Sequence, residues 1–213
     1  MPSPPNDCPR CPRLAAFRAE NRRKFPDFRN EPVPAFGDPG ARLLIVGLAP
    51  GLRGANRTGR PFTGDFAGTL LYETLIKFGF ATGTYQARPD DGLTLHDCRI
   101  INAVRCVPPE NKPLPAEIAT CNDYLAADIA TMPHLRAILA LGGIAHQATL
   151  RAFGLKQSHG KFAHGATTIL SLPLAGTITL TDSFHVSRLN TNTGRLTTPM
   201  FERIVEQLRA ALT

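Results

Sequence analysis

Four of the five cysteines occur in two pairs whose spacing suits metal binding. Cys8 and Cys11 form a C-x2-C pair near the N-terminus, and Cys106 and Cys121 flank a proline-rich loop. Four thiolates from two segments could hold an iron–sulfur cluster or a tetrahedral zinc ion, and the spacing does not choose between them. Simple burial explains the N-terminal pair poorly, because its neighbours are Pro, Asp, Asn and Arg. Burial does suit Cys98, which precedes an apolar run.

Three polar clusters follow apolar runs that are typical of buried strands. The run 42–48, RLLIVGL, leads into the cluster GLAPGLRGANRTGRPFTGD. Asn102 lies in a second run, RIINAV at 99–104, and the cluster SFHVSRLNTNTGR follows a last short run at 177–181. Ligands of open parallel sheets bind beyond the carboxyl ends of the strands. We therefore expect these clusters to meet at one face.

The elements that must position these clusters alternate between strand and helix. Buried runs at 135–141 and 167–172 predict further strands, and 167–172 is expected to form a hairpin with 177–181 through 173–176. Apolar residues at helical spacing predict a helix over 67–78. Further helices are expected over 14–25, about 115–131, from the Gly pair at 142–143 to about 153, and about 198–212. This alternation favours one α/β domain, a parallel sheet covered by helices on both sides.

The composition excludes several classes of protein. The 213 residues include 24 Lys and Arg against 17 Asp and Glu, a formal net charge of +7, and 43% are hydrophobic, which indicates a folded chain. No run reaches the roughly 18 apolar residues of a membrane helix. The N-terminus lacks the apolar core of a secretory signal, so we expect a cytoplasmic protein. The basic excess favours a polyanionic partner.

Seven short blocks along the chain contain recognisable motifs. They are Gly47-Leu48-Ala49-Pro50-Gly51, GANRTGRPFTGD at 54–65, NAVRC at 102–106, ALG at 140–142, FAHG at 162–165, HVSRLN at 185–190 and TGR at 193–195. Together, in this order and over nearly the whole chain, they resemble the uracil-DNA glycosylase superfamily. The resemblance is specific to its family 5 (B-type) bacterial and archaeal branch.

The resemblance implies both an architecture and an activity. It implies a central four-stranded parallel sheet between helices, in three layers, within one domain of residues 1–213. It implies a [4Fe–4S] cluster that ties the N-terminal segment 1–30 to this domain, held by Cys8, Cys11, Cys106 and Cys121. The implied reaction hydrolyses the N-glycosidic bond of uracil in DNA, and in family 5 also that of hypoxanthine or xanthine. The expected partner is DNA with such a base, bound by a monomer at the nucleoid.

The same resemblance assigns roles to individual residues, because a base must be flipped out of the stack before it can be removed. Phe62 is expected to stack on the flipped base, and the amide of Asn102 to read O4 and N3–H of uracil. His185 is expected to donate to O2 as charge develops there, and Asp65 to orient the attacking water. The base pocket is completed by Gly47, Leu48, Ala49 and Pro50.

Each of these residues has an ordinary structural alternative. Phe62 could anchor its loop to the core, Asn102 could cap a turn, and His185 could be an exposed loop residue. Asp65 could be the N-cap of the helix that starts near residue 66. The Gly-Leu-Ala-Pro-Gly block has no Asp, Asn or Glu where most other branches carry their water-activating residue, which moves that role to Asp65.

Basic and polar residues of the first and last clusters are expected to bind DNA. Arginines would contact phosphates and give salt-dependent affinity without reading sequence. Leu189 would fill the gap left by the flipped base, and Ser187 and Asn190 would add neutral phosphate contacts. Val186 replaces the proline usual in the family, which predicts a looser loop. The arginines are Arg53, Arg57, Arg60, Arg188 and Arg195.

A competing hypothesis is a non-catalytic nucleic-acid-binding module with a structural zinc site of four cysteines. The charge and the cysteines would serve such a module equally well. It leaves unexplained why an acid, an amide and an imidazole lie on three separate strand-end loops.

Overall fold

The computed structural model describes residues 3–172 and 176–213. Within them, five strands form a central sheet in the order β4-β1-β5-β7-β6. Four strands are parallel, as predicted, and β6 is an added edge strand antiparallel to β7. The strands are β1 (Leu43–Gly47), β4 (Cys98–Asn102), β5 (Ala137–Leu141), β6 (Thr167–Leu172) and β7 (Gly176–Ser183).

The expected hairpin between 167–172 and 177–181 is confirmed as the antiparallel pair β6–β7. Its predicted connection falls largely on residues 173–175, which lie outside the described residues. A second, smaller antiparallel pair joins β2 (Ala81–Thr82) to β3 (Thr94–Leu95). This pair is not predictable from the sequence, because two-residue strands carry no periodic pattern.

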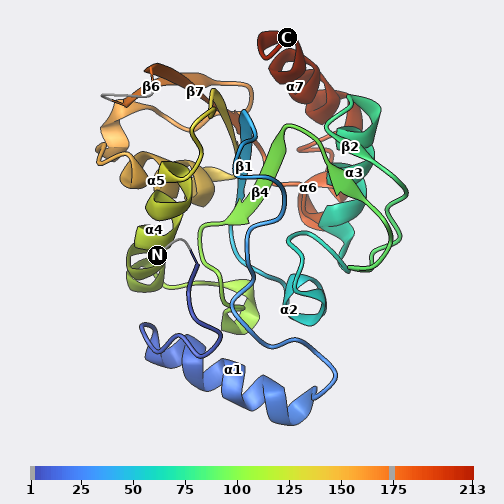
Figure 1. The fold of residues 1–213 in the computed structure, drawn as a ribbon, viewed down its shortest axis with the longest axis vertical. Helices are drawn as coiled ribbons and strands as arrows, with labels where there is room; N and C mark the ends of the chain where they lie inside the picture. The colour runs from blue at the N-terminus through green and yellow to red at the C-terminus, as the bar shows by residue number, and fades with distance from the viewer. Residues whose placement is uncertain (1–2, 173–175) are drawn as a thin grey trace.

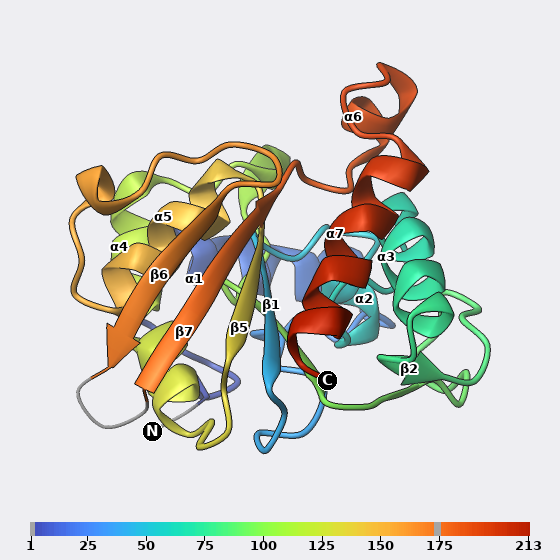
Figure 2. The same cartoon turned by 90° about the horizontal axis from the view of Figure 1, so that it is seen from above.

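Helices cover both faces of the sheet and so complete three layers. Figure 2 shows α4 and α5 on one side of the sheet, α3 and α7 on the other, and α6 projecting beyond the end of α7. In the part of the chain that the structure describes, no helix is long and apolar enough to span a bilayer. The helices are α1 (Pro12–Lys24), α2 (Ala55–Thr58), α3 (Phe66–Lys77), α4 (Pro115–Ala130), α5 (Gly143–Ala152), α6 (Arg188–Asn192) and α7 (Thr198–Ala211), with 3₁₀ turns at Pro109–Asn111 and Gln157–His159.

Strand β1 shows why the central runs are apolar throughout. Successive side chains of a strand point to opposite faces of the sheet. Leu43 and Ile45 therefore pack into the core with α3 and α7, whereas Leu44 and Val46 pack into the core with α4 and α5. A strand covered on both faces must be hydrophobic at every position, and all five residues of β1 are buried.

The register of the parallel strands sets where the polar clusters begin. Gly47, the last residue of β1, pairs with Asn102, the last residue of β4. Ser183 ends β7 opposite Leu141, the last residue of β5. The loops that follow these strands consequently leave the sheet from the same edge.

Helix α1 lies across one end of the molecule, near α2 (Figure 1). Only Leu14 ties it to an apolar cluster, which contains Val104 and Cys121. Polar contacts also attach the helix: Arg13 donates two hydrogen bonds of 2.8 Å to the carboxylate of Glu117 on α4. The N-terminal segment thus packs on the rest of the chain through few apolar contacts.

A buried ionic group joins β4, the loop that follows it and α4. Asp128 on α4 is 0% exposed and accepts hydrogen bonds from Arg99, at 3.0 Å, and from Arg105, which is 1% exposed. Arg105 also donates to the carbonyl oxygen of Val33 at 3.3 Å. Removing one partner of such a pair leaves the other charge buried and uncompensated, which is costly.

We therefore expect Asp128→Asn to lower the free energy of unfolding by about 3–5 kcal/mol, measured by urea denaturation. Asp123→Asn, on the same helix, is the matched control. Its carboxylate is 69% exposed and pairs with Arg10 at the surface, so little change is expected. Equal losses for the two variants would contradict a special role of the buried pair.

Candidate active site

The loop after β1, the start of α3 and the loop after β7 meet around a cleft of about 730 Å³. Its lining includes Asp65 and His185, which are 120 positions apart in the chain. The expected meeting of the first and last polar clusters at the strand ends is therefore observed. From the predicted base pocket, Leu48 and Ala49 line the cleft.

Asp65 occupies the N-cap position of α3, but its side chain forms no capping hydrogen bond. Among the described residues its Oδ1 atom is buried without a hydrogen-bond partner. Burial raises the pKa of the carboxyl group, and the nearby backbone N–H groups of Gly68 and Ala67 oppose this shift. The N-cap alternative thus holds for the backbone only, and one carboxylate oxygen is left for a ligand such as water.

Two glycines of the first cluster make room for this carboxylate. A Cβ atom on Gly54 would lie 2.3 Å from Oδ2 of Asp65, and one on Gly51 would lie 3.1 Å from it. At the first distance the Asp65 carboxylate would have to shift. Glycine at positions 51 and 54 therefore leaves the room that the Asp65 carboxylate occupies.

His185 lies two residues beyond the end of β7 and lines the same cleft. Burial lowers the pKa of its imidazole to about 4, so the ring is neutral at pH 7. The side-chain amide of Asn190 donates to the His185 carbonyl oxygen at 2.8 Å, and the Ser187 hydroxyl accepts from the Asn190 backbone N–H as the N-cap of α6. Ser187 and Asn190 thus hold the His185 loop, a structural role that the sequence analysis did not foresee.

Phe62 and Asn102 lie at the end of β1, behind the lining of the cleft. A Cβ atom on Gly47 would be 2.5 Å from Oδ1 of Asn102 and 2.5 Å from Cζ of Phe62. Both side chains are buried, and Phe62 belongs to the core shared with α3 and α7. Its ring centroid is 6.1 Å from that of His185. Phe62 is therefore a core anchor and a neighbour of the site at the same time.

Phe62 also adopts an unusual backbone conformation. Its φ angle is +53°, in the left-handed region that bulky residues seldom occupy. Such strain persists only where the surrounding structure enforces it, and it is concentrated at functional sites.

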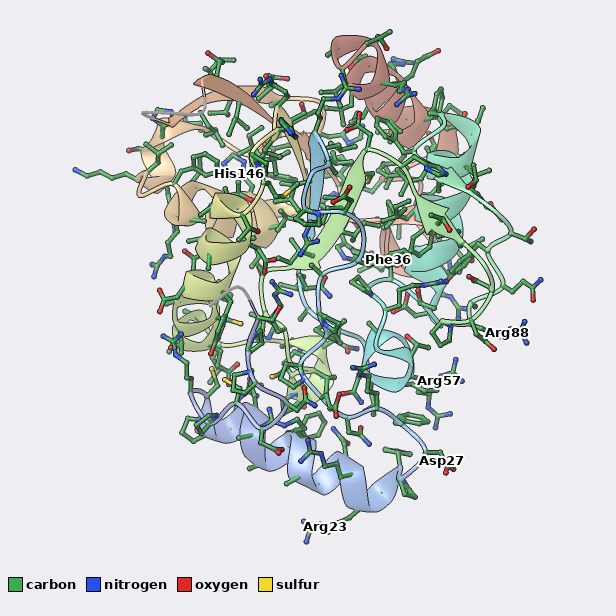
Figure 3. The ribbon with its side chains drawn as sticks, viewed as in Figure 1. Arg23, Asp27, Phe36, Arg57, Arg88 and His146 are labelled. Atoms are coloured by element: carbon green, nitrogen blue, oxygen red, sulfur yellow. The ribbon has the colours of Figure 1, made fainter. Side chains whose placement is uncertain are left out.

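Four of the five predicted phosphate-binding arginines are exposed. Arg53 and Arg188 line the cleft, and the Arg188 guanidinium lies 5.1 Å from the ring centroid of Phe66. Arg195 lies 4.6 Å from the ring centroid of Phe184. Figure 3 shows Arg57 at the surface of α2. These positions leave all four guanidinium groups accessible to DNA.

The assignment of Arg60 to phosphate binding is wrong. Its side chain is 6% exposed, and two hydrogen bonds of 2.8 Å join it to Asp91, whose side chain is 0% exposed. Its Nε donates to the Thr63 hydroxyl at 2.7 Å, and its guanidinium lies 5.3 Å from the ring of Phe36, which points into the interior in Figure 3. This arginine is structural.

The loop after β7 combines a buried and an exposed apolar residue. Val186 is 0% exposed and packs into the core with α3 and α7. The expectation that valine loosens the loop is therefore wrong, because its side chain anchors it. Leu189 is 71% exposed on the projecting helix α6, as a residue that inserts into DNA would need to be.

Two residues that line the cleft, Asn111 and Phe66, were not among the predicted site residues. Asn111 contributes from the proline-rich loop after β4, where no motif marks it. Phe66 could have been noticed because it follows Asp65 directly. Gly47 and Pro50, predicted in the base pocket, are buried rather than part of the lining.

The four paired cysteines line one small cavity between α1, the loop after β4 and α4. Arg18 donates to Sγ of Cys106, and the Arg105 backbone N–H to Sγ of Cys121, both at 3.4 Å. Cys98 is fully buried in the main core instead, as predicted. Within the described ranges, no group of three or more His, Cys, Asp and Glu side chains is arranged to hold a metal ion. Burial raises the pKa of the Cys106 thiol to about 12.

Comparison with known proteins agrees with the resemblance. Residues 34–209 match the sequence model of the uracil DNA glycosylase superfamily. A type-5 uracil-DNA glycosylase of Thermus thermophilus is 46% identical over 210 residues, covering 96% of this chain and 94% of that protein. Those of Mycobacterium bovis and Pyrobaculum aerophilum are 42% and 38% identical, covering 95% and 96% of this chain and 77% and 88% of theirs. The chain therefore belongs to the uracil DNA glycosylase superfamily, in its type-5 branch.

Proposed function

We propose that this protein is a DNA repair enzyme that hydrolyses the N-glycosidic bond of uracil in DNA and leaves an abasic site. The names of its relatives support this activity. The observation that carries the proposal is the pairing, in one cleft, of the partly buried Asp65, with an unpartnered oxygen, and the neutral His185. A binding module would have no use for this pair.

DNA binding and base flipping come first in the proposed reaction. Arg53, Arg57, Arg188 and Arg195 contact phosphates around the cleft, and Leu189 enters the stack as the nucleotide leaves it. Flipping costs a few kcal/mol and is easier at a mismatch. The flipped base then enters the cleft until it meets the buried residues Phe62 and Asn102. The Phe62 ring stacks on the base, and the Asn102 amide hydrogen-bonds to its edge.

Bond cleavage follows from the two groups of the cleft. As the C1′–N1 bond breaks, its electron pair moves onto uracil, and the N–H of neutral His185 stabilises the charge on O2. The Asp65 carboxylate stabilises the positive sugar, orients the attacking water and accepts its proton as the C1′–O bond forms. None of the described residues that line the cleft is a lysine, so a water-only reaction without strand cleavage is proposed.

We propose that Cys8, Cys11, Cys106 and Cys121 hold a [4Fe–4S] cluster that ties segment 1–30 to one domain of residues 1–213. Their convergence on one cavity and the two N–H···S contacts suit a cluster. A zinc ion would use the same four thiolates, so the choice of a cluster rests on the resemblance to family 5. The cluster would supply cross-linking between segments.

The oligomeric state, the location and the range of bases removed complete the proposed function. One copy of the chain contains the whole cleft, so we propose that a monomer acts on the DNA of the nucleoid, in the cytoplasm. We include hypoxanthine and xanthine in the proposed substrates, since the resemblance is to a family that accepts them.

Excision of the base and its dependence on Asp65 test the proposed function together. Oligonucleotides with uracil, hypoxanthine or xanthine, single- and double-stranded, are incubated with protein and then cleaved with alkali. Wild-type protein should give product, and Asp65→Ala should lower the rate by about 10²- to 10⁴-fold while DNA binding remains measurable. Asp27→Ala, an exposed acid elsewhere, is the control. Wild-type rates for Asp65→Ala would refute the mechanism.

The pH dependence tests the neutral imidazole. The single-turnover rate should be flat between about pH 6 and pH 8, because His185, with a pKa of about 4, stays neutral there. It should fall at acid pH, where Asp65, whose pKa burial raises, takes up a proton. An inflection near about 6.5 that His185→Gln removes would show that His185 titrates normally, contrary to this expectation.

Metal analysis tests the cluster. Purified protein should be brown and contain roughly four iron atoms per chain. Cys106→Ser should lose colour and iron, whereas Cys98→Ser, the buried fifth cysteine, should keep both. Colourless protein that contains zinc would contradict the proposed cluster.

A further inference from the structure

The loop between β2 and β3, residues 83–93, has no role in the site described above, yet its two ends contact the segment that carries Phe62. Tyr85, near its start, and Asp91, near its end, make these contacts. Arg88, at its tip, points away from the protein (Figure 3). We call residues 83–93 the bracing loop.

Two tyrosine hydroxyls donate to consecutive carbonyl oxygens on either side of Phe62. Tyr72, on α3, donates to the carbonyl oxygen of Pro61 at 2.6 Å, and Tyr85 donates to that of Phe62 at 3.1 Å. The two rings pack together with centroids 4.8 Å apart. Burial raises the pKa of both phenols, so both remain donors at neutral pH.

These bonds restrain the strained backbone of Phe62. The Pro61 carbonyl belongs to the peptide plane before Phe62, and the Phe62 carbonyl belongs to the plane after it. Holding both planes therefore holds the φ and ψ angles of the residue between them. The φ angle so held is +53°, and it is the one that places the ring against Gly47 and Asn102.

Helix α3 has a glycine, Gly68, where the Tyr85 hydroxyl meets the Phe62 carbonyl oxygen. A Cβ atom on Gly68 would lie 1.9 Å from the Phe62 carbonyl oxygen and 2.1 Å from the Tyr85 hydroxyl oxygen. The hydrogen bond between Tyr85 and Phe62 therefore exists only because residue 68 is glycine.

The other end of the bracing loop is fastened to the same segment. Arg60, two residues before Phe62, makes the buried bidentate pair with Asp91. The Asp91 carboxylate also accepts the backbone N–H groups of Gln86, at 3.0 Å, and Leu93, at 3.1 Å. The loop is thus closed on itself and on Arg60 by one carboxylate.

We propose that Tyr85 is a positioning residue that, with Tyr72 and the Arg60–Asp91 pair, sets the place of the Phe62 ring and hence the stacking of the flipped base. The proposal rests on the proposed glycosylase function. It assigns a role in base recognition to a loop that lies outside the cleft.

A double-mutant cycle tests whether Tyr85 acts through Phe62. Single-turnover excision from uracil DNA is measured for Tyr85→Phe, which removes only the hydroxyl, in the wild-type and the Phe62→Leu backgrounds. In the wild-type background the maximal rate should fall about 3- to 10-fold, because the hydrogen bonds of the hydroxyl to Phe62 and from Gly64 are lost. The half-saturating protein concentration should change less than about 2-fold, because the arginines are untouched. In the Phe62→Leu background the hydroxyl should have almost no effect.

Neighbouring acids of the bracing loop give a matched control. Asp91→Asn should slow excision, whereas Asp90→Asn should leave it unchanged, because Asp90 is 76% exposed and its nearest cation, Arg88, is 3.7 Å away. Equal effects of Tyr85→Phe in both backgrounds, or no effect in either, would overturn the proposal.

Amide hydrogen exchange separates failure of this proposal from failure of the proposed function, since it needs no activity. Tyr85→Phe should speed exchange in the segment 62–65 about 3- to 10-fold, in part because the Gly64 N–H donates to the Tyr85 hydroxyl. Unchanged exchange there would overturn the restraint by Tyr85. Faster exchange in a protein whose wild type excises no base would support the restraint and refute the function alone.

Discussion

The close approach of side chains to the backbone at the end of β1 is the constraint on which the site depends. The Asn102 amide and the Phe62 ring both lie where a Cβ atom of residue 47 would be. A Cβ atom at residue 47 would force these side chains to shift, so glycine suits the end of β1, which lies level with the end of β4. Phe62 meets this point with a left-handed backbone, and two hydroxyls and a buried ion pair converge on its loop.

Burial acts on the two titratable groups of the cleft in the same sense, since it favours the uncharged form of each. In the proposed reaction this suits His185, because a neutral ring donates a hydrogen bond without an extra charge, and it opposes the role proposed for the Asp65 carboxylate. The N–H groups at the start of α3 counter the shift of the Asp65 pKa, as the positive end of a helix does for any anion.

Much of the fold could be predicted, because β1 and β5 are apolar on both faces, β4 has an apolar centre, and several helices have periodic apolar residues. The meeting of Asp65 and His185 followed from motif and topology together. Arg60 could not be assigned, since its partner Asp91 lies 31 positions further on. The role of Asn190 toward His185 was also hidden, because a side-chain bond to a neighbouring carbonyl leaves no pattern in the sequence. The short elements α2, α6, β2 and β3 are below the length at which periodicity can be seen.

Because Asp91 closes the bracing loop, substitutions at its tip and at its ends should have different effects. The Arg88 side chain at its tip points away from the protein (Figure 3), whereas the neighbouring Pro89 carbonyl oxygen accepts a hydrogen bond from Arg60 at 3.5 Å. The ends of the loop are coupled to the pocket, so an inserted or deleted residue between Tyr85 and Asp91 would shift one anchor relative to the other. If Phe62 stacks on the base as proposed, the length of this surface loop affects the fit of the base without a change to any residue of the cleft.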